Sequence, residues 1–139
     1  MRRWMVAALL LTCLVLLSAT GYAAGPTTEE KVKELTAKAA QDYLQSGLIL
    51  AGEGRDAEAV KSFQQAIGLA PNWAEAHSLL GSALGRAGND REAEAELRKA
   101  VQLQPDYAEG YYALGVFLKE RHRDQEAQEA FNKAKQLAR

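Results

Sequence analysis

Few side chains in this sequence have the type and spacing that catalysis or metal binding requires. Neither of its two histidines, His77 and His122, has a second histidine or a cysteine at the spacing of a metal site. The single cysteine, Cys13, lies in the apolar N-terminal segment, which excludes a disulfide framework for the remainder. We expect His77 to be a packed structural residue and His122 to be a solvated turn residue. The sequence therefore predicts no metal and no cofactor.

Nucleophiles and phosphate-binding loops are equally hard to find. Ser62, Ser78 and Ser82 occur in ordinary helical sequence, without the strained strand-to-helix turn of a serine nucleophile. The stretch Gly52-Glu53-Gly54 lacks the lysine and the preceding strand of a phosphate loop, so we interpret it as a turn between helices. The many carboxylates are explained by helix ends and solvated helix faces. We expect a protein that is not an enzyme.

Composition excludes one binding class and favours one fold class. The 139 residues include 17 basic and 18 acidic side chains, so no excess of positive charge exists to attract nucleic acid phosphates. Hydrophobic residues make up 47% and charged residues 25%, as in a globular protein. The chain is rich in alanine and poor in β-branched residues, which favours helix over strand.

The first residues have the pattern of a secretory signal peptide. Arg2-Arg3 precede the apolar run Val6–Leu17, and small residues follow that run. We predict a signal peptide over residues 1–24, with cleavage near Ala23–Ala24. The protein is then expected to be periplasmic or secreted.

The alternative is an uncleaved anchor that holds the protein in a membrane and faces the periplasm. The apolar window Met5–Ala19 would span ~22 Å as a helix, short of the ~30 Å hydrocarbon core. We therefore favour cleavage, and expect membrane contact only through the leader if it is retained.

A repeat of 34 residues organises the rest of the chain. It is marked by glycine, leucine, aspartate and alanine positions: Gly47, Gly81 and Gly115; Leu50, Leu84 and Leu118; Asp56, Asp90 and Asp124; Ala59, Ala93 and Ala127. One further position holds the bulky residues Phe63, Leu97 and Phe131. The repeat predicts a domain over residues 40–139, in units 40–73, 74–107 and 108–139.

Each unit is predicted to contain two helices. In the second unit, apolar residues recur at three- and four-residue steps before Gly88-Asn89 and again after them. We expect Asp90 and its equivalents to be N-caps whose carboxylates accept backbone N–H bonds. We also expect Gly81 and its equivalents to lie where the two helices cross most closely, where a larger side chain would cost about 1–3 kcal/mol.

The two ends of the repeat domain carry further signals. Thr27 and Glu30 fit a capping box that begins a helix, so segment 25–39 either lengthens the first repeat helix or caps the stack. At the other end, one apolar position reads Ile67, Val101 and then Lys135, as a terminal repeat requires for solubility. Some apolar surface is still expected to remain open there for self-association.

The repeated residues resemble the tetratricopeptide repeat family. In the middle unit the family's pattern falls on His77, Leu80-Gly81, Leu84, Ala93, Leu97, Ala100 and Pro105. The first unit departs from it by having Ser46 where leucine is usual. The resemblance implies an all-α fold, a right-handed α-solenoid of three helix–turn–helix repeats. It also implies a protein or peptide partner held in the groove that the first helices line.

Carried onto this chain, the family's groove positions form the predicted partner-binding site: Leu44, Gln45, Leu48, Glu75, Ser78, Leu79, Ser82, Arg86, Glu109, Tyr112, Val116 and Lys119. We expect Tyr112 to face the groove, whereas Leu44 could equally be buried in the core. The basic clamp by which one subgroup grips chaperone tails is missing, since its positions hold Leu44, Leu48, Leu79, Glu109 and Ala113.

Two functions follow as hypotheses. The first is an exported adaptor or scaffold that binds a partner segment in the groove, with a role in the assembly of an envelope complex. The alternative is a structural protein that associates with itself through its terminal repeat, for example as a homodimer.

Overall fold

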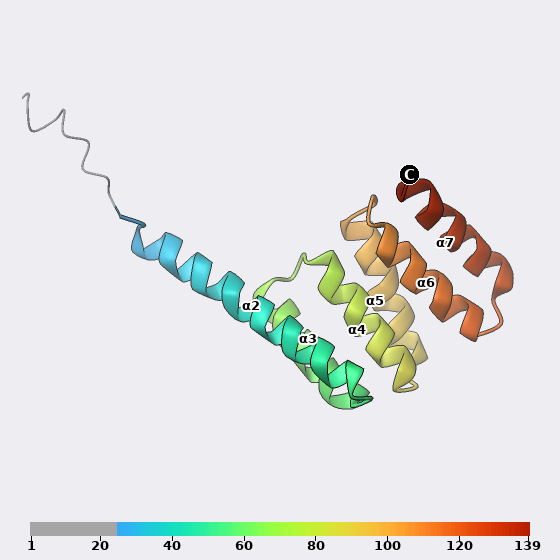
Figure 1. Ribbon diagram of the computed structural model, residues 1–139, viewed down its shortest axis with the longest axis horizontal. Coiled ribbons are helices and arrows are strands. Elements are labelled where there is room, and N and C mark those ends of the chain that lie inside the picture. Colours follow the sequence, from blue (N-terminus) through green and yellow to red (C-terminus); the bar gives the residue numbers. More distant parts are fainter. Residues whose placement is uncertain (1–24) are drawn as a thin grey trace, which may run out of the picture. The chain divides into compact units, whose positions relative to one another are not determined.

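The computed structural model describes residues 25–139, and within that range every regular element is a helix (Figure 1). The helices are α2 (Thr28–Gly52), α3 (Asp56–Leu69), α4 (Ala74–Arg86), α5 (Asp90–Leu103), α6 (Ala108–Glu120) and α7 (Asp124–Leu137). The predicted signal peptide and its cleavage site lie outside the described residues. The predicted all-α solenoid of helix–turn–helix repeats is confirmed.

The described residues fall into two units that divide between Lys33 and Glu34. In the first unit, the backbone N–H of Thr27 donates to Glu30 Oε2 at 2.7 Å, and the N–H of Glu30 donates to Thr27 Oγ1 at 3.2 Å. This reciprocal pair is the predicted capping box. Helix α2 begins at Thr28 and continues to Gly52, so residues 28–39 lengthen the first repeat helix.

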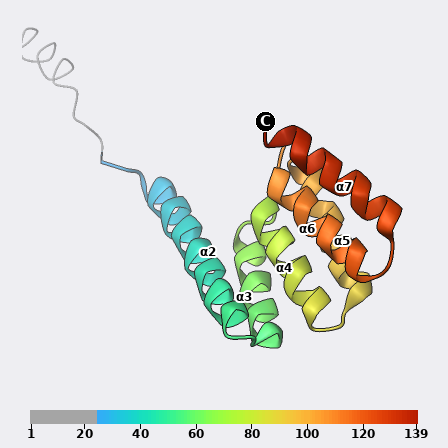
Figure 2. The same cartoon turned by 45° about the vertical axis from the view of Figure 1, so that its right-hand side comes forward.

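In the second unit, successive helices pack as hairpins placed side by side (Figure 2). Helix α4 contacts α3 and α5, while α6 contacts α4, α5 and α7. The core consists mainly of alanine, leucine and phenylalanine side chains that these helices bury against one another. Burial of one apolar face per helix, shared with the next hairpin, is how a repeat protein builds a continuous core.

The predicted close approach at the repeated glycines is confirmed. A Cβ added to Gly47 would lie 2.5 Å from Phe63 Cε1, and one added to Gly81 would lie 2.6 Å from Leu97 Cγ. At Gly115 the nearest atoms belong to the ring of Phe131, at 2.7 Å. The bulky side chain of the second helix therefore rests directly on the glycine of the first.

The prediction that aspartates cap the second helices is wrong. The N-cap residues are Arg55, Asn89 and Arg123, and none makes a side-chain capping bond. Asp90 stands one residue later, in the first turn of α5, and accepts a hydrogen bond from Arg121 of the next repeat. Asp56 likewise accepts a bond from Arg86 Nε at 2.7 Å. These two carboxylates link neighbouring repeats, while their place in the first turn still favours the helix dipole.

The Asp90–Arg121 pair makes stability depend on pH. The hydrogen bond from Arg121 lowers the pKa of Asp90 in the folded protein. The pair therefore stabilises the fold above about pH 3.9, the pKa of an aspartate in the unfolded chain. This stabilisation is lost as the pH falls through the lower pKa of the folded state. We expect Asp90→Asn to melt below the unaltered protein at neutral pH and equally with it in strong acid. Thermal melts across pH test this.

Asp124→Asn is the matched control, because Asp124 occupies the same place in α7 and pairs with no arginine among residues 25–139. An equal pH-dependent loss in both variants would assign the effect to the helix dipole instead.

His122 holds a backbone conformation that the other repeats give to glycine. Its φ is 59°, and the equivalent positions are Gly54 at 74° and Gly88 at 86°. As predicted, its side chain is exposed in the turn before α7. We expect His122→Gly to raise the free energy of unfolding by about 1 kcal/mol, because an L side chain is strained there. Urea denaturation measures it, and Gly88→His should cost a similar amount; unchanged stability in both would contradict the strain.

His77 is the packed structural residue that the sequence predicts. It is 1% exposed, with Nδ1 2.5 Å from Glu96 Oε2 and Nε2 2.9 Å from the carbonyl oxygen of Pro71. The ring therefore ties α4 to α5 and to the turn that precedes α4.

Candidate partner-binding surface

Helices α4 and α6 enclose a hollow of about 260 Å³, here called the central hollow. It is lined by Ser82, Gly85, Arg86, Tyr112, Ala113, Val116, Phe117 and Glu120. Four of these residues, Ser82, Arg86, Tyr112 and Val116, belong to the predicted site. The repeat thus brings residues of two different first helices, α4 and α6, into one surface.

The floor of the central hollow is apolar and firmly held. Phe117 is 5% exposed, and a Cβ on Gly85 would lie 3.2 Å from its ring. The guanidinium of Arg121 lies over the same ring, 4.5 Å from its centroid, and donates to the carbonyl oxygen of Gly85 at 2.8 Å. This cation–π contact and hydrogen bond fix the ring against α4.

Charges of both signs flank that floor. Arg86 pairs with Asp56 of the preceding repeat, and Glu120 accepts a hydrogen bond from Arg121 at 2.8 Å. Both side chains remain about half exposed, at 47% and 58%. The hollow therefore offers an apolar floor with one accessible cation and one accessible anion beside it.

Two predicted site residues are buried, which corrects the prediction for them. Leu44 is 6% exposed and belongs to the core, and Ser78 is 4% exposed. Tyr107, the N-cap residue of α6, covers Ser78 and hydrogen-bonds to it, and burial raises the pKa of Tyr107. Leu79 is partly buried against the core. A helix pattern shows which side of its own helix a residue occupies, but not which neighbour covers it.

The other predicted residues are accessible but lie apart from the central hollow. They are Gln45, Leu48, Glu75, Glu109 and Lys119, all exposed. Gly85, Ala113, Phe117 and Glu120 are the lining residues outside the predicted set. The size of Phe117 could have identified it from the sequence, because the equivalent positions in the other repeats hold the smaller residues Ile49 and Ala83.

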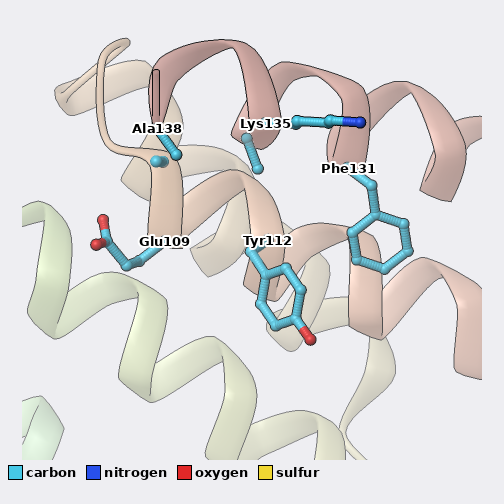
Figure 3. A pocket seen from close by; sticks show the side chains of 7 residues that line it. Glu109, Tyr112, Phe131, Lys135 and Ala138 are labelled. Atoms are coloured by element: carbon cyan, nitrogen blue, oxygen red, sulfur yellow. The ribbon is translucent and has the colours of Figure 1, made fainter.

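A larger hollow of about 580 Å³ opens between α6 and α7, here called the terminal hollow (Figure 3). It is lined by Ala108, Glu109, Tyr112, Phe131, Ala134, Lys135 and Ala138. The rings of Tyr112 and Phe131 lie 5.5 Å apart, tilted by 54°. Tyr112 is 60% exposed and takes part in both hollows. Apolar surface at this end agrees with the expectation from the sequence.

Several titratable groups of the described residues are engaged in ion pairs. Hydrogen bonds from Arg123 lower the pKa of Glu94 and of Glu126, and a bond from Arg55 does the same for Glu58. Within residues 25–139, no three histidine, cysteine or acidic side chains gather as a metal site would need. In the same range no helix has the length and apolarity to cross a membrane.

The repeats define a class of helical interaction modules, and family comparison identifies it. Tetratricopeptide repeat models match residues 40–72, 74–107 and 96–129. The chain belongs to the tetratricopeptide repeat family. No curated protein sequence matches it.

Solved structures share the fold. A crystal structure of MamA matches with a TM-score of 0.64 and 22% identity, covering 73% of this chain and 60% of MamA. The first repeat domain of Spaghetti (RPAP3), bound to the HSP90 peptide SRMEEVD, matches at 0.68 and 20%, covering 73% of this chain and 80% of that one. The Arabidopsis OM64 domain also matches at 0.68 and 20%, covering 73% and 84%. This chain thus spans about 60% of the length of MamA.

Proposed function

We propose that this protein is a protein–protein interaction scaffold that binds a segment of a partner in the central hollow. The observation that carries the proposal is the rigid apolar floor at Phe117, flanked by Arg86 and Glu120 on two different helices. Such a site suits an extended segment or amphipathic helix that inserts one apolar side chain and pairs its own charges at the sides. Membership of the tetratricopeptide repeat family supports this reading.

The partner is not expected to be an acidic chaperone tail. The positions of the family's carboxylate clamp hold Leu44, Leu48, Leu79, Glu109 and Ala113 in this chain. A terminal carboxylate would meet leucines and Glu109 there instead of the donors it needs. The HSP90 peptide bound to the Spaghetti domain is therefore no guide to this partner.

Photo-crosslinking in the cells that make the protein tests the site. A photoreactive residue at Ser82 or Val116 should capture a distinct protein, whereas one at Gln102, exposed on α5, should not. The captured partner should then bind the purified Val116→Glu variant about tenfold or more weakly, because burial of one apolar side chain contributes about 1.5–3 kcal/mol.

Two results would overturn the proposal. One is capture of the same proteins from Gln102 as from the hollow. The other is unchanged affinity of the captured partner for a folded Val116→Glu variant.

We further propose that the protein is exported, to the periplasm or the exterior, and that it serves the assembly of an envelope complex there. The basic start, short apolar run and small residues of segment 1–24 support export. N-terminal sequencing of the protein from cell fractions tests it. A mature chain that begins near Ala24 is expected, and an intact leader in the cytosol would contradict export.

A further inference from the structure

Each end of the repeat domain carries a hollow. Between repeats inside the chain, the equivalent surfaces are covered by side chains of the neighbouring repeat. One of the two hollows is the terminal hollow of α6 and α7. The other, here called the leading hollow, lies on α2, has a volume of about 370 Å³ and is lined by Ala39, Asp42, Tyr43 and Ser46. We propose that the terminal hollow binds the leading hollow face of α2 from a second copy of this chain, so that copies associate head to tail.

The repeat register shows that these two surfaces are the halves of one junction. Inside the chain, α6 packs against α4 and α5. Its N-cap residue Tyr107 and its residues Gly110, Tyr111 and Leu114 stand two repeats after Ala39, Asp42, Tyr43 and Ser46. Likewise, Tyr112 and Lys135 of the terminal hollow stand one repeat after Ser78 and Val101. A second copy stacked on the third repeat as each repeat stacks on the one before it would bring its α2 into the terminal hollow.

Side-chain sizes at this junction are complementary, with large and small residues exchanged. Inside the chain the small Ser78 is covered by the large Tyr107, which hydrogen-bonds to it. Between copies, the equivalent pair is the large Tyr112 with the small Ala39. The exposed ring of Tyr112 would therefore cover the alanine, and the combined volume at this point of the junction is kept.

Charges are complementary at the neighbouring position. Inside the chain Val101 faces Gly110, since a Cβ on that glycine would lie 3.3 Å from Val101 Cγ1. Between copies, the equivalent pair is Lys135 with Asp42, both exposed and each lining its own hollow. An apolar contact within the chain thus becomes an ion pair between chains. Opposite charges at matched positions argue for a second copy as the occupant.

One contact opposes the association. Asp90 pairs with Arg121 inside the chain, whereas the equivalent residues between copies are Asp124 and Glu53, which carry the same charge. Glu53 is already paired with Arg55, at 2.9 Å, which limits the repulsion. We therefore expect reversible association that is sensitive to salt.

Sedimentation of the purified chain over a range of concentrations tests the proposal. Because each copy keeps one free end of each kind, a head-to-tail contact makes the average mass grow past the dimer. Lys135→Glu and Asp42→Lys each place like charges at the junction and should weaken association by about tenfold or more. A mixture of the two variants should associate again, because each then offers the charge that the other lacks. Asp124→Arg should strengthen association of the otherwise unaltered chain.

Lys133→Glu is the matched control, because it makes the same charge change on the same helix outside the terminal hollow. Circular dichroism establishes that each variant remains helical. A monomer at every concentration would overturn the proposal, and so would a mixture that fails to associate. A mass that stops at the dimer and responds only to Lys135→Glu would instead mean that two terminal hollows face each other.

Discussion

Phe63→Ala should lower the free energy of unfolding by about 3–5 kcal/mol, the usual cost of removing a buried phenylalanine ring. Phe63 is 1% exposed, and its ring rests on Gly47 of the facing helix. An alanine there cannot fill the space, and the backbone of α2 cannot close it without losing its other contacts. Chemical denaturation measures the loss.

Leu69→Ala, in the same helix, is the control for this substitution. Leu69 is 40% exposed, so the change should cost far less. Hydrogen exchange adds a spatial test, because repeats contact only their neighbours. Protection should fall most in α2 and α3. An equal fall in α7 would contradict the expectation that each repeat has its own local stability.

Gly81→Ala should lower the free energy of unfolding by about 1–3 kcal/mol, although alanine is the better helix former. The new Cβ would lie 2.6 Å from Leu97 Cγ and 2.9 Å from the carbonyl oxygen of Ala93. The second contact is with backbone, so rotation of a side chain cannot relieve it, and the two helices of the repeat must separate. Thermal and urea denaturation both report the loss.

Gly68→Ala should change the free energy of unfolding in the opposite direction. Gly68 lies in α3 and a Cβ there would meet no atom within 4 Å, so helix propensity alone acts and should stabilise by about 0.5–1 kcal/mol. At Gly115 the nearest atoms all belong to the ring of Phe131, which is less buried than Leu97. Gly115→Ala should therefore be rescued by Phe131→Leu, whereas Leu97→Ala should not rescue Gly81→Ala. Equal losses at Gly68 and Gly81 would refute the packing argument.

The sequence alone determined the helices, their pairing and the points where they touch most closely. Residue types recurring every 34 positions require each repeat to have the same local structure. Gly88 and the prolines end helices through backbone geometry that no distant contact can change. For the same reason the capping box at Thr27 and Glu30 was correctly predicted, since all of its atoms lie within one turn.

The tertiary structure decided which side chains remain accessible and what the aspartates do. Ser78 and Tyr112 occupy the same register position, yet Ser78 is buried because Tyr107, at the start of α6, covers it. Asp90 does not cap its helix because it stands one residue inside it, after the N-cap Asn89, and its carboxylate accepts a hydrogen bond from Arg121 of the next repeat. A periodic pattern fixes the direction of a side chain about its own helix, whereas burial and pairing depend on the length and charge of residues that arrive from the next repeat.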